Sequence, residues 1–396
     1  MGAKKRVCFF SGDITRGGGT ESVAVLIANC LAGQGKYEIM FLSLVEQCEM
    51  PHFPIRPEIR RYRLGEKWIQ PGPGYLAVLP KLKKFLRERN VDVVVDIDIV
   101  LDALTLPVRR DSGVKVVSWG HFSYYFEQAS LYRRIIMKMG AKRADYCVTI
   151  TEENRRCYER YLHRSGALRT IYNPAALPGT VLGNGAGHGV KGDRKAPGDS
   201  IADPLAARAR KQGSGAASAN YILWAGRLEE IKGVDYLAET ARQVLGSLPD
   251  WKWLVAGDGR LRGWLEAYIQ SQGLQERLVL LGRVEDLGPY YRNAAVFALT
   301  SHSEGLPMCL LEAKAFSLPC VSFDIPTGPG EIIRDSVNGY LVEPYDCGRL
   351  AERILELARD EKLRERFSRD TALDMEKFDL EHILDSWNEV FDSLCG

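Results

Sequence analysis

The sequence predicts an α/β protein with two doubly wound domains, each built on a parallel sheet. Short apolar runs alternate with amphipathic stretches at helical spacing, which is typical of βαβ units. The chain has 396 residues, too many for one ordinary hydrophobic core. We expect four parts: a first domain at 1–177, a flexible Gly/Ala/Lys-rich insert or linker at 178–220, a second domain at 221–378, and a last helix at 379–396.

Six apolar runs predict the strands of the first domain. The clearest is VDVVVDIDIV, because a continuous Val- and Ile-rich run is typical of a parallel strand covered on both faces. The six runs are 6–11, 39–44, 91–97, 114–118, 146–150 and 168–172. Helical patterns separate most of them, so the first domain is predicted to be Rossmann-like.

Two segments that follow strand ends in the first domain carry candidate ligand-binding residues. Gly17, Gly18 and Gly19 in GDITRGGGTES precede an expected helix at 20–31, and glycine lets the backbone approach a phosphate. A plain strand-to-helix turn explains this run about as well, because the third glycine of a dinucleotide fingerprint is missing. His121 in SWGHFSYYF is either a ligand contact or a neutral histidine satisfied by hydrogen bonds in a cleft wall.

The second domain repeats the alternation after a change of composition. Residues 178–220 are rich in Gly, Ala, Ser, Lys and Arg, and a segment of this length and composition is predicted to be partly disordered. Strands are then expected at 221–225, 253–256, 278–281, 296–299 and 320–323. Apolar residues at helical spacing over 380–394 predict the last helix.

A cationic segment, AGRLEEIKG, directly follows the expected strand at 221–225. It places Gly226, Arg227 and Lys232 beyond the carboxyl end of that strand, where open α/β sheets bind ligands. Two cations suit a diphosphate, whereas beside a helix start with no anion they would oppose the helix dipole. We therefore expect an anion here.

The segment SEGLPMCLLE places Glu304 and Glu312 eight positions apart, across a turn formed by Gly305, Leu306 and Pro307. Proline is favoured in the first helical turn, so Glu304 is expected on the loop and Glu312 within the helix. The helix start suits a phosphate, and ionised carboxylates accept hydrogen bonds from hydroxyl groups. Both glutamates could then bind one ligand.

Together, GRLEEIKG and SEGLPMCLLEA resemble the E-x7-E signature of retaining glycosyltransferases of family 4, which have the GT-B fold with two Rossmann-like domains facing across a cleft. The resemblance is strongest over 221–342, weaker in the first domain and absent from the insert. It implies that Arg227 and Lys232 stabilise the departing diphosphate of a nucleotide sugar. It also implies that Glu304 lies near the transferred sugar and that Glu312 binds the ribose hydroxyls.

The resemblance assigns further residues to the donor site. It implies that His121 reaches the donor sugar, that the glycine loop of the first domain faces the donor, and that backbone groups of Arg283 and Val284 hold a uracil edge. The run DIPTGPGE is similar to variants in members that use UDP-hexoses or UDP-N-acetylhexosamines, so UDP is preferred and a purine nucleotide stays open. Glu304 either forms a covalent intermediate or, as the resemblance implies, acts in a same-face displacement.

Composition limits the cofactors, partners and location. The 53 basic and 51 acidic residues leave a net charge of +2, so no overall field favours nucleic acid. Nine cysteines without a C-x-x-C pair argue against a disulfide framework or zinc site and favour a reducing cytoplasm. Asp96 and Asp98 more simply mark a strand end than a metal site, so no metal and no cofactor beyond the nucleotide-sugar substrate are expected.

Basic residues gather in two helical stretches of the first domain, at 132–143 and 81–89. The first either lies on an anionic membrane or is a solvated helix face above a core stripe. A membrane contact at the inner face would suit a lipid-linked acceptor.

The sequence therefore predicts a cytoplasmic, metal-independent, retaining glycosyltransferase. It would move a hexose or N-acetylhexosamine from a UDP-sugar to a hydroxyl of a glycan or lipid-linked acceptor, in polysaccharide or glycoconjugate synthesis. Three alternatives remain at this point: a sugar-nucleotide epimerase on the same two-domain plan, an NAD(P)-dependent oxidoreductase and a non-catalytic binding module.

Overall fold

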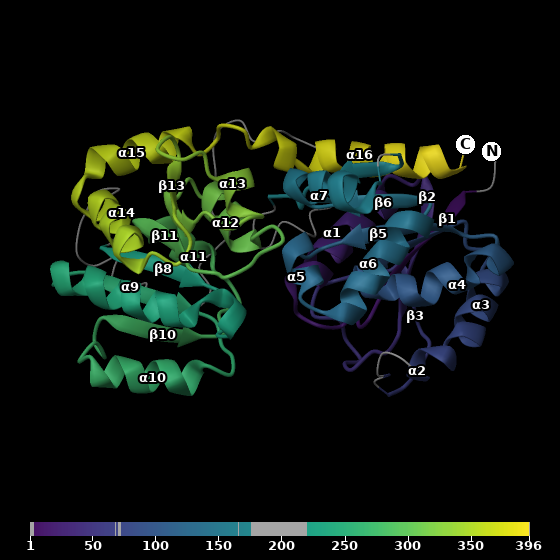
Figure 1. Cartoon of the computed structure of the whole chain (residues 1–396), viewed down its shortest axis with the longest axis horizontal. Helices are drawn as coiled ribbons and strands as arrows, with labels where there is room; N and C mark the ends of the chain where they lie inside the picture. The colour runs from purple at the N-terminus through teal and green to yellow at the C-terminus, as the bar shows by residue number, and fades with distance from the viewer. Residues whose placement is uncertain (1–3, 68, 70–72, 165, 176–219, 396) are drawn as a thin grey trace.

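The computed structural model describes residues 4–67, 69, 73–164, 166–175 and 220–395. These residues form two α/β domains that lie side by side, with the last helix returning to the first domain (Figure 1). The insert expected at 178–220 lies outside the described residues apart from Asn220.

The first domain has a seven-stranded sheet in which every pairing is parallel. Its order across the sheet is β3 (Arg60–Arg63), β2 (Tyr37–Ser43), β1 (Lys5–Ser11), β4 (Val93–Ile97), β5 (Lys115–Gly120), β6 (Tyr146–Thr149) and β7 (Leu168–Thr170). The order reverses between β1 and β4, as in a Rossmann fold. Its helices are α1 (Gly19–Gly33), α2 (Pro73–Leu76), α3 (Leu79–Glu88), η1 (Ile99–Leu101), α4 (Asp102–Ser112), α5 (Tyr124–Gln128), α6 (Leu131–Arg143) and α7 (Glu152–Leu162).

The second domain has a six-stranded parallel sheet with the corresponding reversal between β8 and β11. Its order is β10 (Leu278–Gly282), β9 (Lys252–Ala256), β8 (Tyr221–Ala225), β11 (Val296–Leu299), β12 (Cys320–Phe323) and β13 (Gly339–Val342). Its helices are η3 (Glu230–Lys232), α9 (Val234–Ser247), α10 (Arg262–Ser271), α11 (Gly288–Asn293), α12 (Met308–Ala315), α13 (Pro329–Ile332), α14 (Cys347–Arg359) and α15 (Glu361–Asp370). The prediction of two doubly wound domains is confirmed.

Sequence reasoning missed the strand β3 in one sheet and the strand β13 in the other. β3 reads RRYR and lies at the sheet edge, where charged residues replace the apolar run of a central strand. β13 reads GYLV and has only four residues. The expected strands were otherwise found, with ends displaced by at most two residues.

The chain returns to the first domain through η4 (Glu376–Phe378) and α16 (Leu380–Cys395). Figure 1 shows α16, in yellow, lying along the first domain. The buried ring of Trp387 lies 4.8 Å from that of Trp119 and 6.3 Å from that of Phe9. The last helix therefore completes the hydrophobic core of a domain that begins more than three hundred residues earlier.

We predict that Trp387→Ala lowers the free energy of unfolding of the first domain by about 3–5 kcal/mol, because it leaves a cavity in a packed aromatic cluster. Chemical denaturation followed by circular dichroism measures the change. Asp385→Ala on the exposed face of the same helix is the control and should change the free energy by no more than about 0.5 kcal/mol. Equal effects of the two substitutions would contradict the packing role of α16.

Candidate active site

Two of the predicted catalytic side chains meet at the carboxyl edge of the second sheet, where the strand order reverses between β8 and β11. Lys232 ends η3 after β8, and Glu304 lies in the loop after β11. Lys232 Nζ is 2.6 Å from Glu304 Oε1, and their side chains are only 22% and 8% exposed. Open α/β sheets bind ligands at such a reversal, so the ion pair lies where a ligand is expected.

Close contacts between the two loops fix the ion pair. Gly233 has a φ of 61°, and a Cβ on it would lie 1.9 Å from the carbonyl oxygen of Thr300. Only glycine fits this contact. Thr300 Oγ1 donates to the Lys232 carbonyl oxygen at 3.1 Å, and Ser301 Oγ donates to Glu304 Oε1 at 2.6 Å. The ion pair is therefore held by backbone and side-chain contacts from both loops.

The charge of Lys232 depends on Glu304. Burial acts to lower the pKa of Lys232, but the adjacent Glu304 carboxylate more than offsets this, and the pKa is raised overall. Glu304 Oε1 accepts two hydrogen bonds, whereas Oε2 has no partner in the part of the chain that the structure describes. The site thus offers a fixed positive charge and one unoccupied acceptor oxygen.

Glu312 lies in α12, one turn after Glu304's loop. Its Oε2 accepts a hydrogen bond from the Tyr291 hydroxyl at 2.8 Å. Burial raises the pKa of Glu312 to about 7, and the bond from Tyr291 offsets only part of this rise. The charges of Glu304, Lys232 and Glu312 all act on the thiol of Cys309, so the structure brings these three predicted side chains into one neighbourhood.

The turn after Glu304 touches the first domain. A Cβ on Gly305 would lie 2.1 Å from the carbonyl oxygen of His121, so glycine allows this approach between the domains. His121 is buried, and its ring lies 4.3 Å from that of Trp119. Burial lowers the pKa of His121 to about 3, which keeps the imidazole neutral. Its Nε2 has no hydrogen-bond partner among the described residues.

Leu306 and Pro307 complete this turn, and both are buried. Pro307 is the N-cap of α12, so the helix begins at Met308. Thr327 Oγ1 donates to the Glu304 carbonyl oxygen at 2.5 Å. The backbone at Glu304 is therefore held from a third loop, the one that follows β12.

The other predicted donor contacts lie along the same sheet edge. Gly226 directly follows β8. Arg227 has a side chain that is 68% exposed and pairs with Glu229 at 3.1 Å, while its charge still acts on Lys232. Arg283, after β10, is exposed, whereas Val284 packs against the hydrophobic core.

The glycine loop of the first domain lies near α12, since a Cβ on Gly19 would be 3.8 Å from Met308 Cγ. Arg16 binds the buried Glu21 carboxylate at 2.6 Å. That carboxylate folds back onto the loop, where a Cβ on Gly18 would lie 2.3 Å from it. The start of α1 therefore already holds an ion pair, in which Arg16 offsets the charge of Glu21.

Sequence reasoning did not single out the hydroxyl groups that orient the acidic pair. Ser301, Thr327 and Tyr291 come from three different loops or helices and bind Glu304 or Glu312. Hydroxyl residues are frequent and no motif marks these positions. Only Thr327 carried a signal, because it lies in the run DIPTGPGE.

The Asp-Ile-Asp segment of the first domain lies at a strand end. Asp96 is in β4, while Asp98 caps η1 and pairs with Arg133 at 3.1 Å. Within the described ranges, no group of three or more His, Cys, Asp or Glu side chains has an arrangement that could hold a metal ion.

Comparison with known proteins gives consistent matches in both domains. A model of group 1 glycosyl transferases matches residues 207–373, and a model of glycosyltransferase family 4 matches residues 17–177. An uncharacterised glycosyltransferase of Haemophilus influenzae is 24% identical over 98% of this chain and 99% of its own length. The lipopolysaccharide 1,6-galactosyltransferase of Escherichia coli is 28% identical over 67% of this chain and 65% of its own length.

Three other relatives are 32–34% identical to this chain, but each match covers less than half of the relative's own length. Among solved structures, an Anabaena protein, HepE, in complex with UDP and glucose, aligns with a TM-score of 0.75 at 18% identity, over 98% of this chain and 99% of that one. The strand order of the two parallel sheets and the matches in both domains indicate the same family and the same fold. The chain therefore belongs to the glycosyltransferases of family 4 and has their GT-B fold of two Rossmann-like domains.

Proposed function

We propose that this enzyme is a retaining glycosyltransferase that moves a hexose or N-acetylhexosamine from a UDP-sugar to a hydroxyl of a glycan or lipid-linked acceptor. The observation that carries the proposal is the part-buried Lys232–Glu304 pair at the reversal of the second sheet. A cation and a carboxylate beside each other match the two ends of a nucleotide sugar, its diphosphate and its hydroxyl groups.

In this proposal, Lys232 and Arg227 neutralise the diphosphate as it leaves. The positive charge of Lys232 is held in place by Glu304 before any ligand arrives, so little reorganisation is needed when negative charge develops. Arg227 is exposed and paired only with Glu229, which leaves it able to turn toward the phosphates. These two cations supply charge stabilisation without a metal ion.

The contacts of Glu304 favour a binding role over that of a nucleophile. Its Oε1 already accepts hydrogen bonds from Lys232 and Ser301, which lowers the reactivity of the carboxylate. Its Oε2 is available to accept a hydrogen bond from a sugar hydroxyl. We therefore propose a same-face displacement in which the leaving phosphate accepts the proton of the incoming hydroxyl, and the anomeric configuration is retained.

The neighbouring residues fit the remaining parts of the donor. His121 is neutral, its carbonyl oxygen lies beside Gly305, and its buried Nε2 has no hydrogen-bond partner among the described residues, so the imidazole can form a hydrogen bond to the transferred sugar. Glu312 can accept from the ribose hydroxyls, and the backbone at Arg283 and Val284 can hold uracil. The UDP and glucose of the Anabaena structure support this donor class.

We further propose a role in the synthesis of cell-surface polysaccharide or glycoconjugate at the inner face of the membrane. The Escherichia coli relative, named for action on lipopolysaccharide, supports this class of acceptor. One stripe of α6 is exposed and runs from Leu131 and Ile135 to Lys138 and Lys142. Apolar side chains beside unpaired cations suit an anionic lipid surface.

A hollow of about 440 Å³ extends the basic end of this stripe. Its cationic lining consists of Arg109, Arg110, Lys142 and Arg143. Among the other cations that the sequence singled out, Lys83 is paired with Asp111 and Arg133 with Glu127 and Asp98. None of the described helices combines the length and the apolar character needed to cross a bilayer.

The function is tested by incubating the protein with UDP-hexoses and UDP-N-acetylhexosamines and a panel of glycan acceptors. We expect UDP release that depends on the acceptor, and a product whose anomeric configuration, measured by NMR, equals that of the donor. A bound donor at a hundred times its dissociation constant should also stabilise the fold by about 2.7 kcal/mol. Epimerised UDP-sugar formed without an acceptor would instead support the epimerase.

We predict that Lys232→Met lowers kcat by about 10²- to 10³-fold, because the departing diphosphate loses a fixed cation. Steady-state UDP release measures kcat. Lys252→Met, an exposed lysine at the opposite end of the same sheet, is the control and should be unchanged. If kcat of Lys232→Met falls by less than about threefold, Lys232 does not stabilise the charge of the departing diphosphate.

We predict that affinity for UDP-glucose rises about tenfold between about pH 6 and pH 8, because Glu312, with a pKa of about 7, becomes ionised over this range and then accepts better from the ribose. Isothermal titration without acceptor measures the affinity. The diphosphate of UDP-glucose is esterified at both ends, so it does not titrate here. Glu312→Gln should remove the dependence of the affinity on pH. If the dependence is unchanged by this substitution, Glu312 does not bind the ribose.

We predict that the protein sediments with anionic liposomes at low salt and is released at high salt, because its unpaired cations bind lipid phosphates through screened charges. A Lys138→Glu/Lys142→Glu variant should remain in the supernatant. Lys252→Glu/Lys362→Glu, at two exposed lysines of the second domain, is the control with the same change of net charge and should still sediment. Recovery of the unchanged protein entirely in the supernatant at low salt would exclude this membrane contact.

A further inference from the structure

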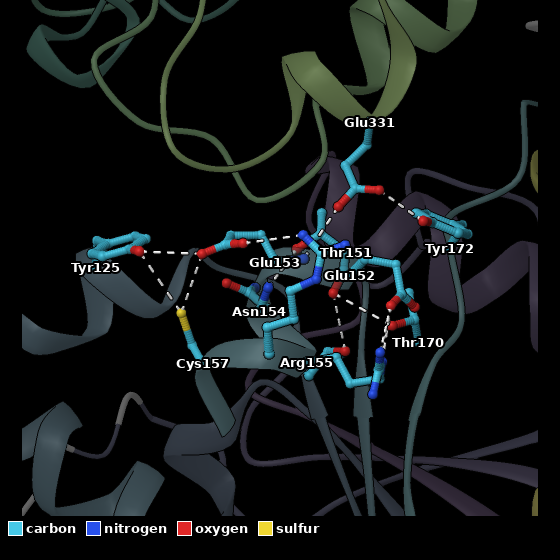
Figure 2. A network of polar contacts seen from close by, with 12 residues as sticks. Tyr125, Thr151, Glu152, Glu153, Asn154, Arg155, Cys157, Thr170, Tyr172 and Glu331 are labelled. Carbon is cyan, nitrogen blue, oxygen red and sulfur yellow. Dashed lines mark hydrogen bonds and ion pairs between the residues drawn. The ribbon is translucent and has the colours of Figure 1, made fainter. Parts of the chain in front are cut away.

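A carboxylate of the second domain reaches across to the first domain. Glu331 lies in α13, and its Oε2 accepts a hydrogen bond from the Tyr172 hydroxyl at 2.7 Å. Its Oε1 accepts one from the backbone N–H of Glu153 at 3.2 Å. Figure 2 shows Glu331 above both partners, with the two contacts diverging from one carboxyl group.

The first partner of Glu331, the backbone N–H of Glu153, lies where a helix favours an anion. Glu153 is in the first turn of α7, where backbone N–H groups have no partner inside the helix and the dipole is positive. The cap residue Thr151 satisfies only the N–H of Asn154. Glu331 thus provides from another domain the acceptor that α7 lacks for Glu153.

Tyr172 lies where the chain passes between the domains. Its ring meets that of Phe378 edge-on at 5.0 Å, and Lys377 lies over it at 5.3 Å from the ring centre. Burial raises the pKa of Tyr172, and the hydrogen bond to Glu331 raises it further. The phenol therefore stays protonated and able to donate.

The same short segment of the second domain also holds the active-site loop. Thr327 Oγ1 donates to the Glu304 carbonyl oxygen at 2.5 Å. Gly328 has a φ of 99°, and a Cβ there would lie 2.7 Å from Pro307 Cδ. One end of the segment 327–331 is therefore fixed to the loop of Glu304, and its other end is fixed by Glu331 to the first domain.

We propose that Glu331 is a positioning residue that fastens the two domains together and thereby holds the Glu304 loop against His121. This inference rests on the proposed function for its effect on transfer, but not for its effect on domain arrangement. Glu331 touches no donor-binding side chain, so its removal acts through the distance between the two halves of the site. A fastened arrangement brings together the Glu304 loop of one domain and His121 of the other, which the reaction requires at the same moment.

The test compares Glu331→Ala, Glu331→Gln and Tyr172→Phe with Glu352→Ala, whose carboxylate pairs only with Arg349 on the surface of α14. We expect Glu331→Ala to raise the radius of gyration in small-angle X-ray scattering and to lower kcat for transfer about tenfold or more. The dissociation constant for UDP should change less than twofold. Tyr172→Phe, which removes one of the two bonds, should lower kcat by about threefold to tenfold.

Glu331→Gln keeps an oxygen that can accept from the Glu153 N–H, so it should retain more activity than Glu331→Ala. This graded loss distinguishes a broken contact from a variant that simply fails to fold. The proposal is overturned if Glu331→Ala and Tyr172→Phe match Glu352→Ala in radius and kcat, or if UDP affinity falls as much as kcat. Radius is measured without any sugar. An opened Glu331→Ala protein, together with a complete lack of transfer by the unchanged enzyme, would therefore reject the proposed function and retain the domain fastening.

Discussion

The site depends on the part-buried ion pair between Lys232 and Glu304. Neither charge is stable in such a place alone, because desolvation of a single ion costs several kcal/mol, and loss of one partner leaves the other unpaired. The pair forms only because the loops after β8 and β11 are neighbours at the reversal of strand order. The doubly wound sheet therefore determines which charges can exist at this edge, and those charges determine what ligand it can accept.

The two glutamates of one sequence motif have different environments. Glu304 is next to a cation and accepts from Ser301, whereas Glu312 is buried beside Tyr291 with a pKa of about 7. Carboxylates with such different surroundings take different roles. In the proposed function, Glu304 accepts from a hydroxyl of the transferred sugar beside the cation that meets the diphosphate, and Glu312 accepts from the ribose hydroxyls.

Contacts between the domains connect the fold to the chemistry. Trp387 of α16 fills the core of the first domain, and Glu331 binds Tyr172 and the start of α7. The first contact is apolar and extensive, while the second consists of two hydrogen bonds that are individually worth about 1 kcal/mol. The last helix is therefore anchored to the first domain by a large apolar contact, and α13 is joined to it by a weaker polar one.

The sequence by itself determined the two domains, most strands and the positions of the acidic and basic motifs, because these depend on local periodicity and on residues close together in the chain. It also predicted Lys232 and Glu304 as members of one site, though not their contact. Only the tertiary structure decided that Glu21 occupies the start of α1, that Arg133 turns inward to Asp98, and that Ser301, Tyr291 and Thr327 orient the glutamates. The same holds for Glu331 and Tyr172, 159 positions apart. Such contacts join residues whose spacing carries no periodic signal, so they exist only once both sheets and the crossing segments have been assembled.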